Sequence, residues 1–276
     1  MKRVIVLGSK PGAAFLPGDA VYAANAALGF YTSDVKHYPT TVNVVSALVL
    51  SKSFADAAGI YGRKWRAVAD ATPSRMVLFA APDTPGCTAA VCEALTAGGY
   101  AAPIEICSVR DRIELVTSVT SLRYPIVTAA VLGQPLATLL DDARRLARFA
   151  VRRRHQPDAS RDCETDAPGK FRPSTGILAL LVAIRDHGPN AEYVLAGIGL
   201  AGRNLHQAAG GIVAGKDRSR GRILPPHICA DIAVLKALRG RYRLRTTEPE
   251  LEPLVAAVPP DRCHPAAALA LSQAAL

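Results

Sequence analysis

The sequence has few aromatic residues and lacks the segments that mark several common protein classes. Phe, Trp and Tyr make up 5% of its 276 residues. This scarcity argues against a carbohydrate-binding module built on aromatic platforms and against a protein that stacks the bases of single-stranded nucleic acid. No run of about 18 apolar residues is present, so we expect no transmembrane helix. The start, MKRVIVLG, has the pattern of a strand rather than of a signal peptide, which favours a cytoplasmic location.

Other short motifs are also missing. The six cysteines are scattered without a C-x-x-C pair, so we expect free thiols in a reducing compartment. The turn after the first predicted strand, GSKPGAAFLPG at 8–18, has neither the G-x-G-x-x-G of dinucleotide-binding folds nor the G-K-[ST] of a P-loop. The one acidic cluster, DCETD at 162–166, is better explained by a solvated loop than by a D-x-D metal site. The sequence therefore predicts neither a bound metal nor a cofactor.

Apolar residues and positive charge are abundant. Half of the residues are hydrophobic, which allows a sizeable core and excludes global disorder. The formal charge is +10 and the isoelectric point is near 9.6. Solubility alone would account for this excess, but it also favours an anionic partner such as a nucleotide, an acidic sugar, nucleic acid or an anionic membrane.

Predicted strands alternate with predicted helices along most of the chain. The strands are expected at 3–8, 20–24, 43–50, 76–81, 103–107, 125–131, 192–197 and 241–246. The helices are expected at 53–70, 84–98, 135–153, 174–187 and 226–240. This alternation predicts an α/β, Rossmann-like fold with a mostly parallel sheet flanked by helices, and ligands at the carboxyl ends of its strands.

Two stretches interrupt this pattern. Residues 155–171 are polar and aperiodic, which predicts a surface loop or a mobile lid inserted in a single domain over 1–248. Residues 249–276 begin rich in proline and end rich in alanine, which predicts a C-terminal arm.

Two turns after early strands hold candidate binding residues. Gly8 and Ser9 follow the first predicted strand, where a glycine lets the backbone turn sharply and brings amides close to a ligand. Asn25 follows the next strand, where a side-chain amide can contact a base or a phosphate. For each residue alone, an ordinary strand-to-helix turn and a turn-forming asparagine are the simpler explanations.

Two predicted helix starts hold the other candidates. Ser174 is placed to cap a helix whose first turn contains Thr175 and Gly176, so that free amides and the positive helix end face an anion. His227 stands at the start of a later helix with Asp231 one turn on, and imidazole has the pKa that suits proton transfer near neutrality. A plain capped helix and a structural histidine are the simpler explanations of each feature alone.

Together these segments resemble the sialyltransferase family best known from the animal Golgi enzymes. Its large motif is similar here to Val6-Leu7-Gly8-Ser9, Asn25, Gly29-Phe30, Asp34-Val35 and Thr40-Thr41. Its small motif is similar to Pro173-Ser174-Thr175-Gly176, an apolar helix, and a strand ending in Gly197-Ile198-Gly199. Its last motif, a histidine followed by an acid, is similar to His227 and Asp231. The resemblance covers roughly the first 45 residues and residues 172–235, and leaves 50–165 unaligned.

The resemblance implies an inverting, metal-independent glycosyltransferase with a GT-A-like variant of the nucleotide-binding fold. It places the CMP half of a CMP-sugar donor on Asn25, Ser174, Thr175 and Gly176, beside the turn at Gly8 and Ser9. It gives His227 the role of general base. The acceptor implied is a glycan or a lipid-linked saccharide of the kind used in lipopolysaccharide or capsule biosynthesis. Neither a cofactor nor a nucleic acid is expected.

The sequence departs from the family pattern in four places. Ser9-Lys10 replaces the asparagine of the first turn, and the charge of Lys10 is the expected substitute at the phosphate. The cysteine pair that links the large and small motifs is absent, which favours a divergent bacterial-type member. The aromatic motif between the small motif and the histidine is not recognisable, and Asp231 follows His227 by four residues instead of five. The donor therefore stays open between sialic acid, Kdo and other ulosonic acids.

Two other classes of protein fit parts of the sequence. A nucleotide-binding protein of the oxidoreductase type would use the same first turn, although the glycine spacing and the missing acid after the second strand disfavour it. The basic segment RRLARFAVRRRH at 144–155 fits a solvated helix face. It also fits a surface that binds nucleic acid or the anionic inner face of a membrane.

Overall fold

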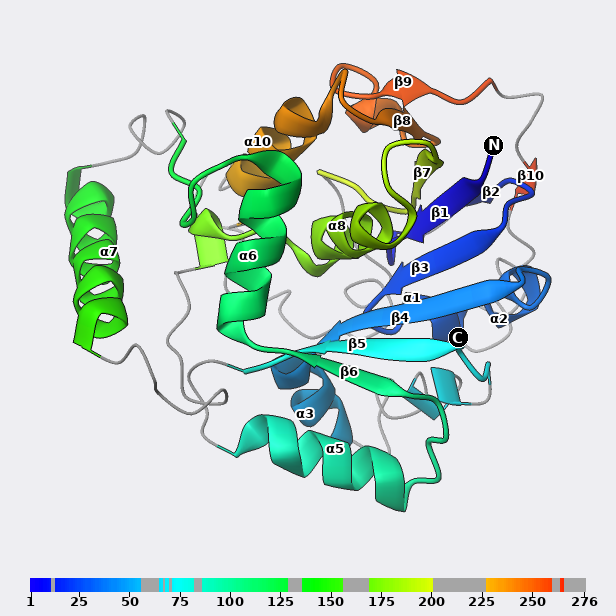
Figure 1. The fold of residues 1–276 in the computed structure, drawn as a ribbon, viewed down its shortest axis with the longest axis horizontal. Coiled ribbons are helices and arrows are strands. Elements are labelled where there is room, and N and C mark those ends of the chain that lie inside the picture. Colours follow the sequence, from blue (N-terminus) through cyan, green and yellow to red (C-terminus); the bar gives the residue numbers. More distant parts are fainter. Residues whose placement is uncertain are drawn as a thin grey trace, which may run out of the picture.

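The protein is an α/β fold whose centre is an eight-stranded parallel sheet (Figure 1). The computed structural model describes residues 1–10, 13–55, 65–66, 68–69, 71–81, 86–128, 136–155, 169–200, 227–259 and 264–265. The strands run, in spatial order, β6 (Ile104–Cys107), β5 (Arg75–Phe79), β4 (Thr40–Ser46), β3 (Ala20–Ala24), β1 (Arg3–Leu7), β7 (Glu192–Ala196), β8 (Arg243–Thr246) and β9 (Ala256–Ala257). A separate antiparallel pair joins β2 (Ala14–Phe15) to β10 (His264–Pro265). The Rossmann-like fold predicted from the sequence is thus confirmed.

Helices cover both faces of the sheet (Figure 1). One face carries α6 (Val109–Thr120), α8 (Thr175–His187) and α10 (Ile228–Leu238), with α7 (Leu136–His155) outside them. The other carries α1 (Ala27–Phe30), α2 (Thr32–Val35), α3 (Ala47–Ala55) and α5 (Cys87–Ala97). Successive side chains of a strand point to opposite faces, so in β1 Val4 and Val6 join the first core and Ile5 and Leu7 join the second. This burial on both sides explains the continuous apolar run of β1.

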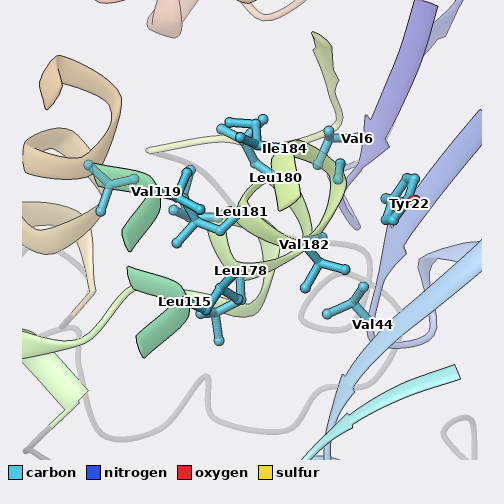
Figure 2. Packing of buried hydrophobic residues seen from close by; sticks show 14 of the residues in the cluster. Val6, Tyr22, Val44, Leu115, Val119, Leu178, Leu180, Leu181, Val182 and Ile184 are labelled. Carbon is cyan, nitrogen blue, oxygen red and sulfur yellow. The ribbon is translucent and has the colours of Figure 1, made fainter. Parts of the chain in front are cut away.

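Helix α8 is the centre of the first core. Its eight residues from Ile177 to Ile184 are all buried. In Figure 2, Val182 lies beside Val44 of the sheet, and Leu180 and Ile184 lie on the side nearer Val6. Leu178 lies beside Leu115 of α6, and Leu181 lies beside Val119. Full burial of such a side chain contributes roughly 1.5–3 kcal/mol. The N-terminus of α8 is thereby fixed at the edge of the sheet.

The order of the strands creates a switch point between β1 and β7. From β1 the chain steps outward through β3, β4, β5 and β6, and then returns to place β7 on the opposite side of β1. In open parallel sheets, ligands bind outside the carboxyl ends of the strands at such a point. Here those ends are followed by Gly8 after β1 and Gly197 after β7.

Several predicted elements are wrong or shifted. The strand expected at 43–50 runs from Thr40 to Ser46, and its apolar run then continues into α3, because a short apolar run carries no period that separates strand from helix. No strand forms over the described part, 125–128, of the one expected at 125–131. Ile126 is apolar because it is buried in the core, and its N–H donates to the carbonyl oxygen of Phe171.

Helix α6 was missed altogether, although its start has a signature. Ser108 and Asp111 form a capping box, in which each side chain accepts a hydrogen bond from the other's backbone N–H. The remaining departures concern the two interrupted stretches. Most of the predicted lid, 156–168, lies outside the described residues, and its end forms the short helix η2 (Gly169–Phe171) with Phe171 buried. The predicted arm begins with η3 (Pro249–Leu251) and adds β9 to the sheet.

Candidate functional site

The turn after β1 is pressed against the turn after β7. The N–H of Gly8 donates to the carbonyl oxygen of Ala196 at 2.8 Å, and the N–H of Lys10 donates to that of Gly197 at 2.9 Å. A Cβ added to Gly8 would lie 2.1 Å from the carbonyl oxygen of Gly197. Close approach of the two turns therefore requires glycine at position 8, whether or not a ligand binds there.

Glu248 links these two turns and was not predicted from the sequence. One carboxylate oxygen accepts from the N–H of Gly197 at 2.7 Å, and the other accepts from Nζ of Lys10 at 2.8 Å. Lys10 also pairs with Glu250 at 3.2 Å. Burial lowers the pKa of Lys10, but its bonds to the two carboxylates outweigh burial and raise it. The only sequence signal is position, because Glu248 follows the carboxyl end of β8 as Gly8 follows that of β1.

The start of α8 lies beside the end of β7. A Cβ added to Gly176 would be 3.5 Å from side-chain carbons of Ile198, which follows that strand. Ser174 caps the helix as predicted, since its Oγ accepts from the N–H of Ile177 at 3.4 Å. Within the described part of the chain, the N–H groups of Thr175 and Gly176 have no hydrogen-bond partner. Two amides and the positive end of a helix thus point to the edge of the sheet.

Asp231 is held against this helix start. Its Oδ1 accepts from the N–H of Ser174 at 2.7 Å, and its side chain is buried. Burial raises the pKa of Asp231 to about 7, although the hydrogen bonds from Ser174 oppose the shift. The carboxyl group therefore titrates near neutral pH, which is unusual for Asp and typical of functional sites.

His227 precedes α10 by one residue and lies against the chain that leads into α8. Its Nδ1 is 3.2 Å from the carbonyl oxygen of Arg172. A carbonyl oxygen only accepts hydrogen bonds, so this contact assigns the proton of the neutral ring to Nδ1 and leaves the lone pair on Nε2. Burial lowers the pKa of His227, and hydrogen bonds to the backbone at Arg172 and Gly169 only partly offset that effect. The imidazole is therefore neutral at pH 7.

Asn25 lies at the same edge, at the end of β3. Its φ is +51°, in the left-handed region that asparagine tolerates better than most residues. Its N–H donates to the carbonyl oxygen of Val44 at 2.7 Å. Its Oδ1 is buried and has no hydrogen-bond partner among the described residues. A donor group from a ligand at this edge would satisfy this acceptor.

The structure places every predicted site residue at the carboxyl edge, and contacts link two groups of them. Gly8, Ser9 and Lys10 form the turn against Gly197, whereas Ser174 joins the α8 start to the segment holding His227 and Asp231. Two other histidines are alternatives to His227 as the base, and one of them, His187, lies at the opposite end of α8, 3.1 Å from the hydroxyl of Tyr22. His206 lies outside the described residues.

An apolar pocket lies elsewhere in the molecule. It is lined by the end of α5, the start of β5 and the neighbouring residues Trp65 and Tyr100, on the face opposite α8. It shares no residue with the carboxyl-edge group and holds no carboxylate or histidine. Its lining therefore offers little for acid–base chemistry, in contrast to the edge near His227 and Asp231.

Comparison of the chain with models of protein families, with curated proteins and with solved structures finds no match. The described residues contain no helix that is both long and apolar enough to cross a membrane.

Proposed function

We propose that the protein is an inverting glycosyltransferase that takes a CMP-activated ulosonic acid as donor. The observation that carries the proposal is the start of α8 at the switch point of the sheet, where two amides have no hydrogen-bond partner among the described residues. A neutral histidine and a carboxyl group with a pKa near 7 lie one segment away. Such an edge suits a phosphate and a proton transfer. The resemblance of the same residues to the sialyltransferase motifs supports the choice of a CMP-sugar.

The donor would bind mainly through backbone groups. A single phosphate accepts hydrogen bonds from the N–H groups of Thr175 and Gly176, where the helix dipole favours negative charge. Oδ1 of Asn25 accepts from the amino group of cytosine. Lys10 contributes less than the sequence alone suggests, because Glu248 and Glu250 already neutralise its charge.

The reaction would proceed by displacement at the anomeric carbon. Nε2 of His227 takes the proton from the acceptor hydroxyl as that oxygen attacks the face opposite the CMP group. The bond between the anomeric carbon and the phosphate oxygen breaks, and CMP leaves with the electron pair on its phosphate. The configuration inverts. When Asp231 is protonated, it carries no negative charge beside the helix start and so does not repel the anionic donor.

A substitution at the first residue of α8 tests the phosphate site. Thr175→Pro removes one amide hydrogen at a helix position where proline is tolerated, and Ser174 already has the extended backbone (ψ 162°) that a following proline requires. Calorimetry should show CMP binding about 10- to 100-fold weaker, the usual value of a hydrogen bond to a charged group. Thr175→Val keeps the amide and should bind CMP normally.

Two further titrations separate this proposal from its rivals. Cytidine lacks the phosphate, so its affinity should be the same for Thr175→Pro and the unmodified protein. Binding of NAD in place of CMP would favour the oxidoreductase type instead. With CMP binding established, CMP-sialic acid and CMP-Kdo should be compared by intact-mass detection of the product, with EDTA added to test the expected independence from metal. Failure to bind CMP at all would refute the proposal.

A further inference from the structure

Helix α7 is attached to the molecule by one narrow face. Asp142 is buried and pairs with Lys170, and Phe149 packs against Tyr124 with ring centroids 6.4 Å apart. Leu139 and Leu146 are partly buried against the same core. Residues three or four apart lie on one side of a helix, so these contacts fix which side of α7 faces inward.

The opposite side of α7 combines exposed arginines with exposed apolar residues. We call this side, made of Leu140, Arg144, Ala147, Arg148, Val151 and Arg154, the outer face of α7. Leu140 and Val151 are 53% and 54% exposed. The three arginines are exposed, and none of them has an acidic partner among the described residues. Elsewhere on the helix, by contrast, Arg145 pairs with Asp141 at 2.8 Å.

Few large hydrophobic side chains are exposed on the described part of the molecule. The described residues include five of them: Met1, Ile106, Val127, Leu140 and Val151. Two are on the outer face of α7. A third, Val127, follows by three positions the tyrosine that packs against α7. Figure 1 shows α7 as the outermost helix, beyond α6, so that its outer face is turned away from the sheet.

We infer that the outer face of α7 docks on an anionic phospholipid surface. Its arginines would contact the headgroup phosphates, and Leu140 and Val151 would enter the boundary between headgroups and acyl chains. A nucleic acid would also attract the arginines, but its phosphate backbone gives two aliphatic side chains nothing to bury against. The inference is independent of the reaction at the carboxyl edge, because no residue of the outer face belongs to that site.

Vesicle flotation with matched variants tests this surface. The full chain should float with phosphatidylcholine vesicles that contain phosphatidylglycerol, and it should stay behind with phosphatidylcholine alone. The triple variant Arg144→Gln, Arg148→Gln, Arg154→Gln should bind the anionic vesicles about 100-fold more weakly. The control variant Lys36→Gln, Lys52→Gln, Lys236→Gln removes the same charge from exposed positions elsewhere and should bind within a fewfold of the unmodified protein. Circular dichroism checks that each variant keeps its helix content.

A second pair of variants separates the apolar contribution. Leu140→Gln with Val151→Gln should weaken vesicle binding about tenfold without changing the charge. Equal losses in the arginine and lysine variants would overturn the inference, since net charge alone would then explain binding. Equal binding to neutral and anionic vesicles, or binding to a DNA duplex without binding to vesicles, would overturn it as well.

Discussion

Helices α7 and α8 belong to the same face of the sheet, yet they differ in almost every physical respect. The 13 residues of α8 include eight consecutive buried ones, which lie between a half-buried N-terminal turn and the exposed Arg185 near the C-terminus. The 20 residues of α7 touch the core along one face and expose a cationic, partly apolar side. The contrast shows two ways in which a helix can offer a binding group. A helix buried on all sides can bind a ligand through the backbone N–H groups at its fixed N-terminus. An amphipathic helix can bind through the side chains along its exposed face.

If α8 supports catalysis and α7 supports membrane binding, a substitution can abolish sugar transfer without weakening vesicle binding. The largest loss of turnover is expected for substitution of His227. Replacing His227 by Ala should lower turnover by roughly 100- to 10,000-fold, the usual contribution of a positioned base. CMP affinity and vesicle binding should stay close to those of the unmodified protein, because the imidazole contacts neither the proposed phosphate site nor α7. Transfer of the sugar from the preferred donor to a soluble acceptor provides the assay.

His187→Ala is the matched control for this variant. His187 lies at the far end of α8, where it contacts Tyr22, so its loss should leave turnover unchanged. A His206→Ala variant should also retain turnover. If turnover fell only in the His206 variant while CMP still bound, the assignment of the base to His227 would be wrong.

The second largest effect is expected inside α8. Leu181 is fully buried between α8 and α6, facing Val119 (Figure 2). Leu181→Ala should lower the free energy of unfolding by about 2–5 kcal/mol, because it removes buried methyl groups and leaves a cavity. Urea denaturation measures this change. A loss below about 1 kcal/mol would mean that the core around α8 collapses to fill the space.

Elements with a local sequence signal could be predicted, whereas elements that depend on distant contacts could not. Strand β3 was predicted at its observed bounds, and α8 within one residue, because long apolar patterns bounded by glycine or a capping serine are local signals. The helix at 109–120 was missed because its polar and apolar residues mix without a strong apolar run, even though its capping box was readable. The predicted strand at 125–131 failed because burial of Ile126 depends on distant Phe171.

The position of the candidate site could be predicted from the sequence, but the hydrogen bonds and ion pairs among its residues could not. Residues after parallel strands must meet at one edge, which is why Gly8 and Asn25 could be placed there from the pattern alone. The partners of Lys10 could not be, since Glu248 and Glu250 are more than 230 residues away in the sequence. Likewise, the contact of Asp231 with the N–H of Ser174 spans 57 residues, and no local pattern reveals it.

Asp231 should make stability depend on pH. Its pKa is about 7 in the folded protein against an ordinary value of 3.8, so the folded state favours the protonated carboxyl group. The stabilisation from this group is complete below about pH 4 and is lost as the pH rises through 7. At 1.36 kcal/mol per pKa unit, the loss is at most about 4 kcal/mol.

Asp231→Asn isolates this effect. The amide oxygen of asparagine can still accept from the N–H of Ser174, but it does not ionise. Relative to the unmodified protein, the variant should therefore gain stability between about pH 4 and pH 7, as measured by urea denaturation. Taking the difference between the two proteins removes the opposite trend from His227, whose lowered pKa makes acid destabilising. Parallel stability profiles would contradict the assignment.

The smallest change in the free energy of unfolding is expected for Leu140 of α7, which is a leucine like Leu181 of α8. Leu140→Ala makes the same truncation on the outer face, where the side chain is already half in solvent. Alanine also has the higher helix propensity, so the free energy of unfolding should change by less than about 0.5 kcal/mol. Binding to anionic vesicles should nevertheless weaken by a few-fold, because the buried CH₂ groups lost are those that would enter the lipid. A leucine that contributes to membrane affinity and not to folding stability is what distinguishes a docking surface from a loosely packed part of the core. If Leu140→Ala destabilised the fold as much as Leu181→Ala, α7 would pack against protein on both sides, and the contrast between the two helices would disappear.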